Sequence, residues 1–247
     1  MSEPRYFHGN GQPYLKPGDL SGKLIVIEGT DGVGRSTQIA EIRQWLEMNG
    51  YGVVTTGLSR SALLTKTIDQ AKAGHTLNVY TYCLLYVADF ADRLEHEIIP
   101  ALRAGFVVIA DRYIYTLIAR AIVRGADPDW IRHVLGFALQ PDAVFYLKIS
   151  LENLVPRVIN SERLYEHYWV EDSPEGLDYW ESGMDLRLGE DFYDSFLEYQ
   201  RRKMTALDAM AKDYDFTILP ASRGFNQVSR LLKQGFMRVL NGEHETA

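Results

Sequence analysis

Five short apolar runs recur along the chain, separated by stretches in which apolar positions repeat every three or four residues. A continuous run rich in Val and Ile is typical of a strand that is buried on both faces of a sheet. A repeat of three to four residues is typical of a helix with one buried face. The expected strands are residues 24–27, 53–56, 106–111, 143–147 and 216–219. The expected helices are residues 38–48, 61–73, 78–103, 192–210 and 225–240. Two further helices are expected to start at residues 112–113 and after Ser150, whose side chain would cap the second.

The order of these elements, strands alternating with helices, decides the expected fold class. Parallel strands joined by helical crossovers carry helices on both faces of the sheet. We therefore expect an α/β fold with a five-stranded parallel sheet and helices on both faces. The helix over 78–103 is expected to bend or break around Pro100, because proline cannot donate the backbone hydrogen bond of a helix.

Two stretches lack a regular repeat. Residues 1–21 contain three prolines and three glycines, which predicts an extended N-terminal arm that could also fold over the domain. Residues 160–190 combine aromatic residues with many acids, and a connection of this length is a lid, a binding loop or a disordered segment. The remaining pattern fits a single domain over 22–247 that includes a lid at about 160–190.

A glycine-rich segment follows the first expected strand and leads into the first helix. It has the sequence GTDGVGRST over residues 29–37 and matches the phosphate-binding pattern G-x-x-x-x-G-K-[ST], except that Arg35 replaces the lysine. Glycines let backbone N–H groups turn toward phosphate oxygens, and the following helix presents its positive end to the same anion. The sequence thus predicts a P-loop NTPase-type sheet and an ATP-binding segment made of Gly29, Thr30, Asp31, Gly32, Val33, Gly34, Arg35, Ser36 and Thr37.

Metal binding is expected from two positions. Ser36 carries the hydroxyl that binds Mg²⁺ in such loops. Asp111 lies at the carboxyl end of an expected strand, and ligands of open α/β sheets bind at the carboxyl ends of the strands. Arg35 keeps a cation near the phosphates but is bulkier than lysine. The alternatives are a plain turn between strand and helix, a turn-forming role for Asp31, and a structural ion pair between Asp111 and Arg112.

Composition narrows the function classes. The chain has 247 residues, 46% of them hydrophobic, and a net charge of −7, so we expect a large core and no general nucleic-acid-binding surface. The single cysteine, Cys83, excludes an intramolecular disulfide and lies in an apolar stretch that indicates a buried thiol. No apolar run approaches the roughly 20 residues that span a bilayer, so we expect no membrane association and a cytoplasmic location.

Four local motifs give the chain a resemblance to the thymidylate kinases over roughly residues 23–240. EGTDGVG at 28–34 resembles the family's E-G-x-D-G-x-G loop, and DRY at 111–113 resembles its D-R-[YF]. PDAVFYL at 141–147 is similar to its P-D-x-x-x-Y-L strand, and residues 218–222 are similar to the loop that passes the adenine of ATP. The resemblance implies transfer of the ATP γ-phosphoryl group to dTMP, giving dTDP for dTTP biosynthesis, with Mg²⁺ as cofactor. It also allows a homodimer through the helices after residue 60.

The resemblance implies roles for individual residues as well. Arg112 would grip the phosphate of the acceptor, because its planar fork suits a phosphate dianion. Asp31 would accept a hydrogen bond from the acceptor's sugar hydroxyl. The expected catalytic residues are Arg35, Asp111 and Arg112, together with Arg163 and Arg187 of the lid. Arg157 is a further candidate for the same role as the two lid arginines. The expected acceptor-binding residues are Asp31, Arg60, Phe90, Arg93, Arg112, Tyr113 and Arg120.

The chain departs from the family pattern where the base is recognised. Phe90 stands where the family often has an arginine, and ARA at 119–121 replaces its A-Y-Q. Arg93, nearly one helical turn further on, could substitute for the missing arginine. Two other functions therefore stay open: a kinase of the same fold with a different acceptor and, because of Arg35, a catalytically weak nucleotide-binding regulatory protein. For each lid arginine the alternative is a solvated surface charge.

Overall fold

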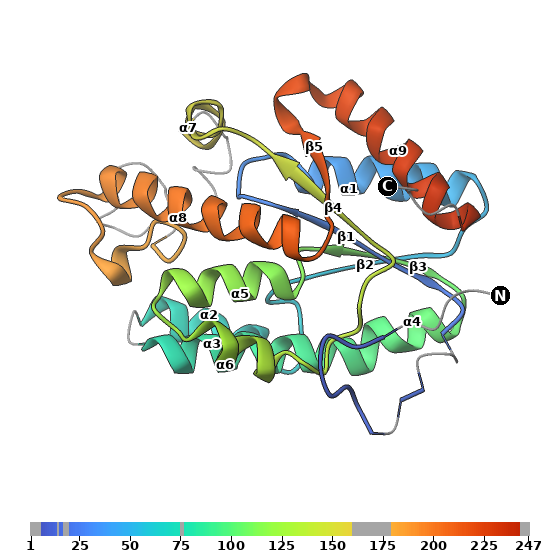
Figure 1. Ribbon diagram of the computed structural model, residues 1–247, viewed down its shortest axis with the longest axis horizontal. Coiled ribbons are helices and arrows are strands. Elements are labelled where there is room, and N and C mark those ends of the chain that lie inside the picture. Colours follow the sequence, from blue (N-terminus) through green and yellow to red (C-terminus); the bar gives the residue numbers. More distant parts are fainter. Residues whose placement is uncertain (1–5, 14, 17–19, 75–76, 160–178, 243–247) are drawn as a thin grey trace.

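The fold is built on one parallel sheet (Figure 1). A computed structural model describes residues 6–13, 15–16, 20–74, 77–159 and 179–242. Its strands follow the order β2-β3-β1-β4-β5, and all neighbouring pairs are parallel. The α/β fold class with a five-stranded parallel sheet is thereby confirmed. The strands are β1 Lys23–Gly29, β2 Val53–Gly57, β3 Val107–Asp111, β4 Ala143–Lys148 and β5 Thr217–Pro220.

Helices cover both faces of the sheet (Figure 1). The pair α1 and α9 packs on one face, and α3, α4, α5 and α8 pack on the other. Among the helices that the structure describes, none is both long and apolar enough to cross a membrane. The helices are α1 Arg35–Met48, α2 Thr65–Ala73, α3 Val79–Arg93, α4 Ile99–Arg103, α5 Ile114–Val123, α6 Pro128–Val134, α7 Leu151–Ile159, α8 Phe192–Asp213 and α9 Phe225–Asn241.

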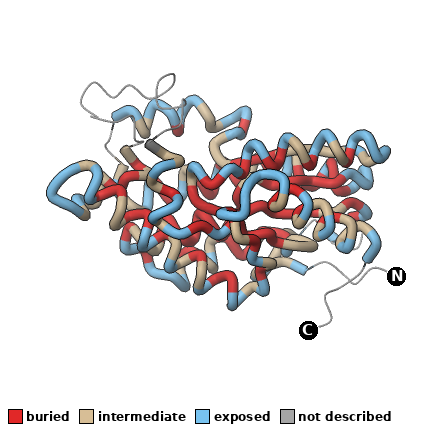
Figure 2. Tube along the Cα trace, turned by 90° about the horizontal axis from the view of Figure 1, so that it is seen from above, coloured by how far each residue is buried: buried red, intermediate tan, exposed pale blue. Residues whose placement is uncertain are grey.

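Two apolar cores lie on the two faces of the sheet, and the central strand contributes to both. Leu24 and Val26 of β1 belong to the core under α3, α4, α5 and α8, whereas Ile25 and Ile27 belong to the core under α1 and α9. Successive residues of a strand face opposite sides, so a strand covered on both faces needs a continuous apolar run. Figure 2 shows the buried stretches in the interior of the molecule and the exposed ones at its periphery.

The long helix expected over 78–103 is interrupted just before Pro100. α3 ends at Arg93, the next five residues form a π-helical turn over Leu94–Ile98, and α4 follows directly. Pro100 has no N–H with which to continue the regular hydrogen-bond ladder, and a wider turn on its N-terminal side accommodates that loss. The expected irregularity is thus confirmed, and the chain keeps its helical course through it.

One helix was not expected from the sequence. α6 is only seven residues long, too short to show a convincing apolar repeat. Its start nevertheless has local signals: Pro128 occupies the first turn, and Oδ1 of Asp127 accepts a hydrogen bond from the backbone N–H of Trp130 at 2.7 Å. A capping acid followed by proline was therefore the available evidence for α6.

The first described residues lie along residues 136–140. Phe7 forms an antiparallel bridge with Leu139, and the backbone N–H of His8 donates to the carbonyl oxygen of Ala138 at 2.9 Å. These backbone hydrogen bonds hold this part of the N-terminal segment against the domain, on the segment that leads into β4.

Candidate active site

The glycine-rich loop connects β1 to α1. Gly29, Gly32 and Gly34 have φ angles of 151°, 75° and 99°, which residues with a Cβ adopt only with strain. Space is also short at Gly32, where a Cβ would lie 2.7 Å from Cγ2 of Val158 in α7. Among the described side chains none caps the N-terminus of α1. The positive end of α1 therefore faces the loop, which can wrap an anion there.

Arg35 begins α1 and folds back toward the loop. Its Nη1 donates to the carbonyl oxygen of Gly29 at 2.6 Å and to that of Thr30. Its Nε donates to Oδ1 of Asp111 at 2.7 Å, and only 8% of the side chain is exposed. The sheet register explains the meeting, because Ile27 near the end of β1 pairs with Asp111 of β3. Arg35 thus ties the loop to the end of the neighbouring strand.

Asp111 lies at the carboxyl end of β3, and the guanidinium groups around it keep it ionised. Its Oδ1 accepts from Arg35, and its Oδ2 is 3.7 Å from Nη2 of Arg60. Burial acts to raise the pKa of this carboxyl, but Arg35 and Arg112 outweigh burial and hold the pKa below its usual value. In the described part of the chain, the ion-pair partners of Asp111 are Arg35 and Arg60 rather than Arg112.

Arg112 instead pairs with Asp31, through Nη2 and Oδ1. Arg112 has a φ of 70°, and its backbone N–H donates to the carbonyl oxygen of Ile27 at 3.0 Å. This turn aims the guanidinium at the loop. Burial acts to raise the pKa of Asp31, but the charge of Arg112 lowers it well below its usual value. Asp31 stays ionised, and 42% of its side chain is exposed, so it can accept a further hydrogen bond.

A cluster of charges lies beside this pair; Arg120 was expected at the acceptor site, whereas Lys203 and Glu181 were missed from the sequence. Nζ of Lys203 in α8 is 2.6 Å from Oε2 of Glu181 and 3.5 Å from Oδ2 of Asp31. Glu181 also pairs with Arg120 of α5. The signal that could have found the cluster is a lysine within the buried stripe of α8, where a charge needs a partner. The stripe also contains the apolar or aromatic residues Phe196, Tyr199, Leu207, Met210 and Ala211.

Five of the expected acceptor-binding residues are buried, and three of them, Phe90, Arg93 and Tyr113, pack together in the interior. Phe90 is fully buried, and its ring meets that of Tyr113 edge to face at 5.1 Å. Arg93 is also buried, pairs with Asp89 at 3.0 Å and donates to Oγ1 of Thr56 at 3.1 Å. These side chains stabilise the packing between β2, α3 and the start of α5, and direct contact between them and an acceptor stays a prediction.

The expected lid is only partly covered by the structure. Arg163 and the rest of residues 160–178 lie outside the described residues. Arg187 is described: it is exposed, has a φ of 50° and follows the 3₁₀ turn Met184–Leu186. The structure thus places Arg187 on the surface, and its role toward a ligand stays a prediction.

Arg157 of α7 links the two loops expected to contact ATP. Its Nη1 donates to the carbonyl oxygen of Val33 at 3.3 Å, and its Nη2 donates to that of Ala221 at 3.0 Å. Ala221 begins the 3₁₀ turn Ala221–Arg223 between β5 and α9. The segment that resembles the adenine-passing loop therefore lies next to the glycine-rich loop.

The hydroxyl groups of the loop differ in their surroundings. Ser36 and Thr37 are exposed at the start of α1, whereas Thr30 is buried and its Oγ1 has no hydrogen-bond partner among the described residues. Mg²⁺ prefers oxygen ligands and is usually held by one or two protein groups together with waters and substrate phosphates. The hydroxyl of Ser36 and the carboxylate of Asp111 fit that set of ligands.

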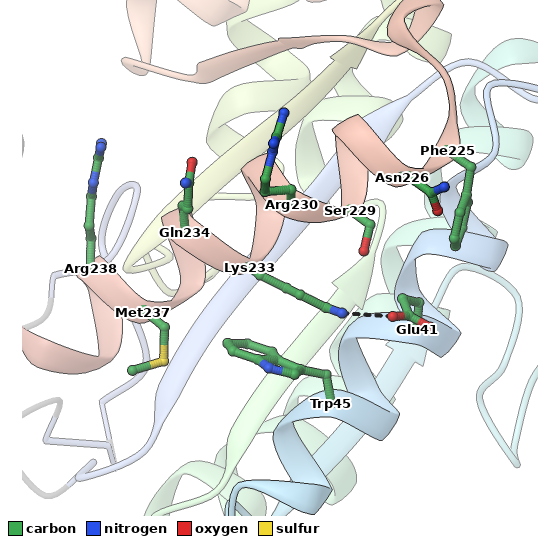
Figure 3. Close-up of a pocket in the computed structure, with 10 residues that line it drawn as sticks. All are labelled: Glu41, Trp45, Phe225, Asn226, Ser229, Arg230, Lys233, Gln234, Met237 and Arg238. Carbon is green, nitrogen blue, oxygen red and sulfur yellow. Dashed lines mark hydrogen bonds and ion pairs between the residues drawn. The ribbon is translucent and has the colours of Figure 1, made fainter.

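A separate groove of ≈ 660 Å³ runs between α1 and α9 (Figure 3). Lys233 of α9 reaches across it, with Nζ 2.7 Å from Oε1 of Glu41 and 5.8 Å from the ring centre of Trp45. α1 and α9 cover the face of the sheet opposite α5 and α8, which carry Arg120 and Lys203. None of the residues predicted to bind ATP or the acceptor lines this groove.

Comparison with known proteins identifies one family. The thymidylate kinase family model matches residues 27–171. The "Probable thymidylate kinase 2" of Saccharolobus solfataricus is 36% identical over 195 residues, which cover 78% of this chain and 85% of that protein. The "Probable thymidylate kinase" of Thermococcus kodakarensis is 38% identical over 148 residues, 55% of this chain and 70% of that protein. The "Thymidylate kinase" of Caldicellulosiruptor saccharolyticus is 33% identical over 147 residues, 56% and 70% respectively.

Proposed function

The chain belongs to the thymidylate kinase family, and we propose that its glycine-rich loop, Asp111 and Arg112 carry out the reaction of that family. The protein is an ATP-dependent nucleoside monophosphate kinase that phosphorylates dTMP to dTDP. One observation carries the assignment of residues: the loop, the acid at the end of β3 and the arginine after it converge through two ion pairs, Arg35 with Asp111 and Arg112 with Asp31.

The loop holds the phosphates of ATP. Phosphoryl transfer needs positioning and neutralisation of charge more than covalent chemistry from the protein. The positive-φ glycines and the uncapped start of α1 support a cradle of backbone N–H groups around the phosphates. Arg35 stands at the position of the usual lysine and supplies a cation there. Arg157 connects the loop, through Val33, to the 3₁₀ turn Ala221–Arg223, beside which adenine would lie.

Ser36 and Asp111 hold Mg²⁺ in this proposal. The bound ion would neutralise charge on the β- and γ-phosphates. The lowered pKa of Asp111 supports the assignment, because only the ionised carboxylate is a good ligand. The ion pair with Arg35 at Oδ1 leaves other lone pairs of the Asp111 carboxylate free, with which it would hold the ion directly or through a water.

Arg112 and Asp31 bind the acceptor. Arg112 grips its phosphate, and the exposed face of the Asp31 carboxylate accepts a hydrogen bond from the sugar hydroxyl. Arg60 is exposed and lies close to Asp111, so it can add a second cation on this side. Arg163 and Arg187 of the lid neutralise charge on the transferring group.

A homodimer through α2 and α3 is part of the proposal. Three large apolar side chains are exposed on this part of the surface: Leu63 at 72%, Tyr80 at 51% and Leu84 at 49%. Tyr80 and Leu84 are four residues apart on α3 and so share one face of it. Exposed apolar side chains on one helix face favour a protein partner, and a second copy of the chain is the partner that the family resemblance implies. We further propose a cytoplasmic location, where ATP and nucleoside monophosphates are available.

The experiment is steady-state release of ADP in the presence of ATP, Mg²⁺ and a panel of nucleoside monophosphates. We expect turnover with dTMP, and a loss of about 100-fold or more in kcat for Asp111→Asn because charge neutralisation by the metal is impaired. Asp129→Asn is the matched control, since Asp129 lies on the surface of α6. Turnover with another monophosphate in preference to dTMP would reject dTMP as the acceptor. Full activity of Asp111→Asn would reject the role of Asp111 in holding Mg²⁺.

A further inference from the structure

Lys203 is a buried cation to which the reaction described above gives no role. Only 2% of its side chain is exposed. Its Nζ is 2.6 Å from Glu181, 3.5 Å from Asp31 and 5.4 Å from the ring centre of Tyr199. Burying a lysine is costly unless its charge is paired, and a methionine or leucine would fill the buried stripe of α8 without that cost. A lysine at this buried position therefore indicates that its charge serves to hold its carboxylate partners, Glu181 and Asp31.

Asp31 is held by cations on both of its oxygens. Arg112 donates to Oδ1, and Lys203 approaches Oδ2. Asp31 is 42% exposed, whereas Lys203 and Arg112 are almost completely buried. Arg35, 3.6 Å from Oδ1, is likewise almost completely buried, so the exposed part of the Asp31 carboxylate is left for the acceptor. Lys203 can fix the orientation of Asp31 without touching the acceptor itself.

Glu181 supplies the counter-charge for this arrangement. It joins Lys203 of α8 to Arg120 of α5, the two helices that pack together on this side of the sheet. The cluster contains the cations of Arg112, Arg120 and Lys203 and the carboxylates of Asp31 and Glu181. Arg35 also lies 3.6 Å from Asp31, but its charge is balanced by Asp111. One positive charge is left over, which suits an anionic ligand such as a nucleoside monophosphate.

We propose that Lys203 is a positioning residue for the acceptor nucleotide: it orients the Asp31 carboxylate toward the acceptor's sugar, and Glu181 holds Lys203 in place. The inference rests on the proposed function, because it gives Asp31 its role through the acceptor. It distinguishes acceptor binding from ATP binding, since Lys203 contacts Oδ2 of Asp31, whereas Arg35 at the start of α1 lies near Oδ1.

The first test measures kinetic constants for both substrates in Lys203→Met. Loss of a charged hydrogen-bond partner predicts an increase of about 10- to 100-fold in KM for dTMP, with KM for ATP changed less than about threefold. Lys212→Met is the matched control, because Lys212 is exposed in the last turn of the same helix. Glu181 keeps its ion pair with Arg120 in Lys203→Met, so a raised KM for dTMP at an unchanged melting temperature does not come from a folding defect.

The second test is the pH dependence of kcat/KM for dTMP, compared with Lys203→Arg. Burial lowers the pKa of Lys203 below the ordinary lysine value of 10.5, against the opposing charges of Glu181 and Asp31. The other charged or titratable groups that face Lys203 are Arg112, Arg120 and Tyr199. As pH rises through the lowered pKa, Lys203 loses its proton and Asp31 loses a partner, so kcat/KM should fall. Arginine keeps its charge at alkaline pH. Lys203→Arg should therefore bind dTMP more tightly than Lys203→Met does, and its kcat/KM should fall at a higher pH than that of wild type.

Two results separate this inference from the proposed function. If wild type turns over dTMP and Lys203→Met has an unchanged KM for dTMP, Lys203 is structural and only this inference is overturned. If wild-type protein neither binds nor phosphorylates dTMP, the proposed acceptor fails and the role of Lys203 is overturned with it.

Discussion

Nε of Arg35 lies 2.7 Å from Oδ1 of Asp111. The residue that replaces the usual loop lysine is therefore bound to the acid proposed to hold Mg²⁺. A lysine ammonium is a single compact charge, whereas the planar guanidinium of Arg35 reaches Asp111 and the carbonyl oxygens of Gly29 and Thr30 together. Arg35 thus stabilises the loop and lowers the pKa of Asp111 at the same time.

Removing the charge of Arg35 should weaken both the fold and ATP binding. In Arg35→Met the loop carbonyls lose a donor and Asp111 loses its closest partner, so we expect a loss of about 1–3 kcal/mol in the free energy of unfolding. ATP affinity should fall at least about tenfold, whereas Arg35→Lys, which keeps the charge, should bind ATP within about threefold of wild type. Urea denaturation and calorimetric titration measure the two quantities.

Arg43→Met is the matched control for that prediction. Arg43 also lies in α1, but its ion pair with Glu47 is exposed on the surface. Such pairs contribute little, so the free energy of unfolding should change by less than about 0.5 kcal/mol. Equal effects of the two arginine substitutions would contradict a special role for Arg35.

The stabilising effect of Asp111 should disappear in acid. Because its folded pKa lies below the ordinary value of 3.8, its contribution is present above that value and is lost as pH falls through the folded pKa. Asp111→Asn should therefore be less stable than wild type at neutral pH, and the two should converge in acid. Urea denaturation along a pH series measures the difference between the two proteins, and the opposite titration of Glu28, whose pKa is raised by burial, cancels in that difference. A difference that is independent of pH would contradict the ionised Asp111.

Gly32 should tolerate alanine less well than Gly50. Both have positive φ, 75° and 83°, so each Ala variant carries backbone strain of about 1 kcal/mol. Only at Gly32 does the new Cβ meet an atom, Cγ2 of Val158 at 2.7 Å, whereas Gly50 has open space. Gly32→Ala should thus lose roughly another 1 kcal/mol through the displaced contact with α7, together with ATP affinity. Chemical denaturation of the two variants checks the order, and an equal loss would mean that the Val158 contact relaxes freely.

A charge at Leu84 should disrupt the proposed dimer. Leu84 is 49% exposed on α3, and burying a glutamate there against a second copy would leave its charge without a partner. We expect Leu84→Glu to be a monomer under conditions in which wild type is a dimer, as measured by light scattering during size-exclusion chromatography. Met48→Glu is the control, because Met48 is 71% exposed at the end of α1, away from α2 and α3. A dimer that survives Leu84→Glu would place the interface elsewhere.

The strands and the glycine-rich loop could be predicted from the sequence because their causes are local. The apolar run of β1 and the glycines at 29, 32 and 34 lie within a dozen residues of one another, and each pattern follows from backbone sterics or from burial of neighbouring positions. The π-helical turn before Pro100 follows from the missing N–H of that residue. In contrast, α6 was missed because seven residues carry too little of a helical repeat.

The charge partners were decided only by the tertiary structure. Arg35 and Asp111 are 76 residues apart in the chain, and Lys203 and Asp31 are 172 apart, and no local pattern relates such positions. Sheet register brings the first pair together, and the packing of α5 against α8 brings Arg120 and Lys203 to Glu181. The sequence by itself thus determined which chemical groups are present: the phosphate-binding loop and the acid at the carboxyl end of β3. Folding decided which charge meets which, because ion pairs depend on distance in space and not on separation along the chain.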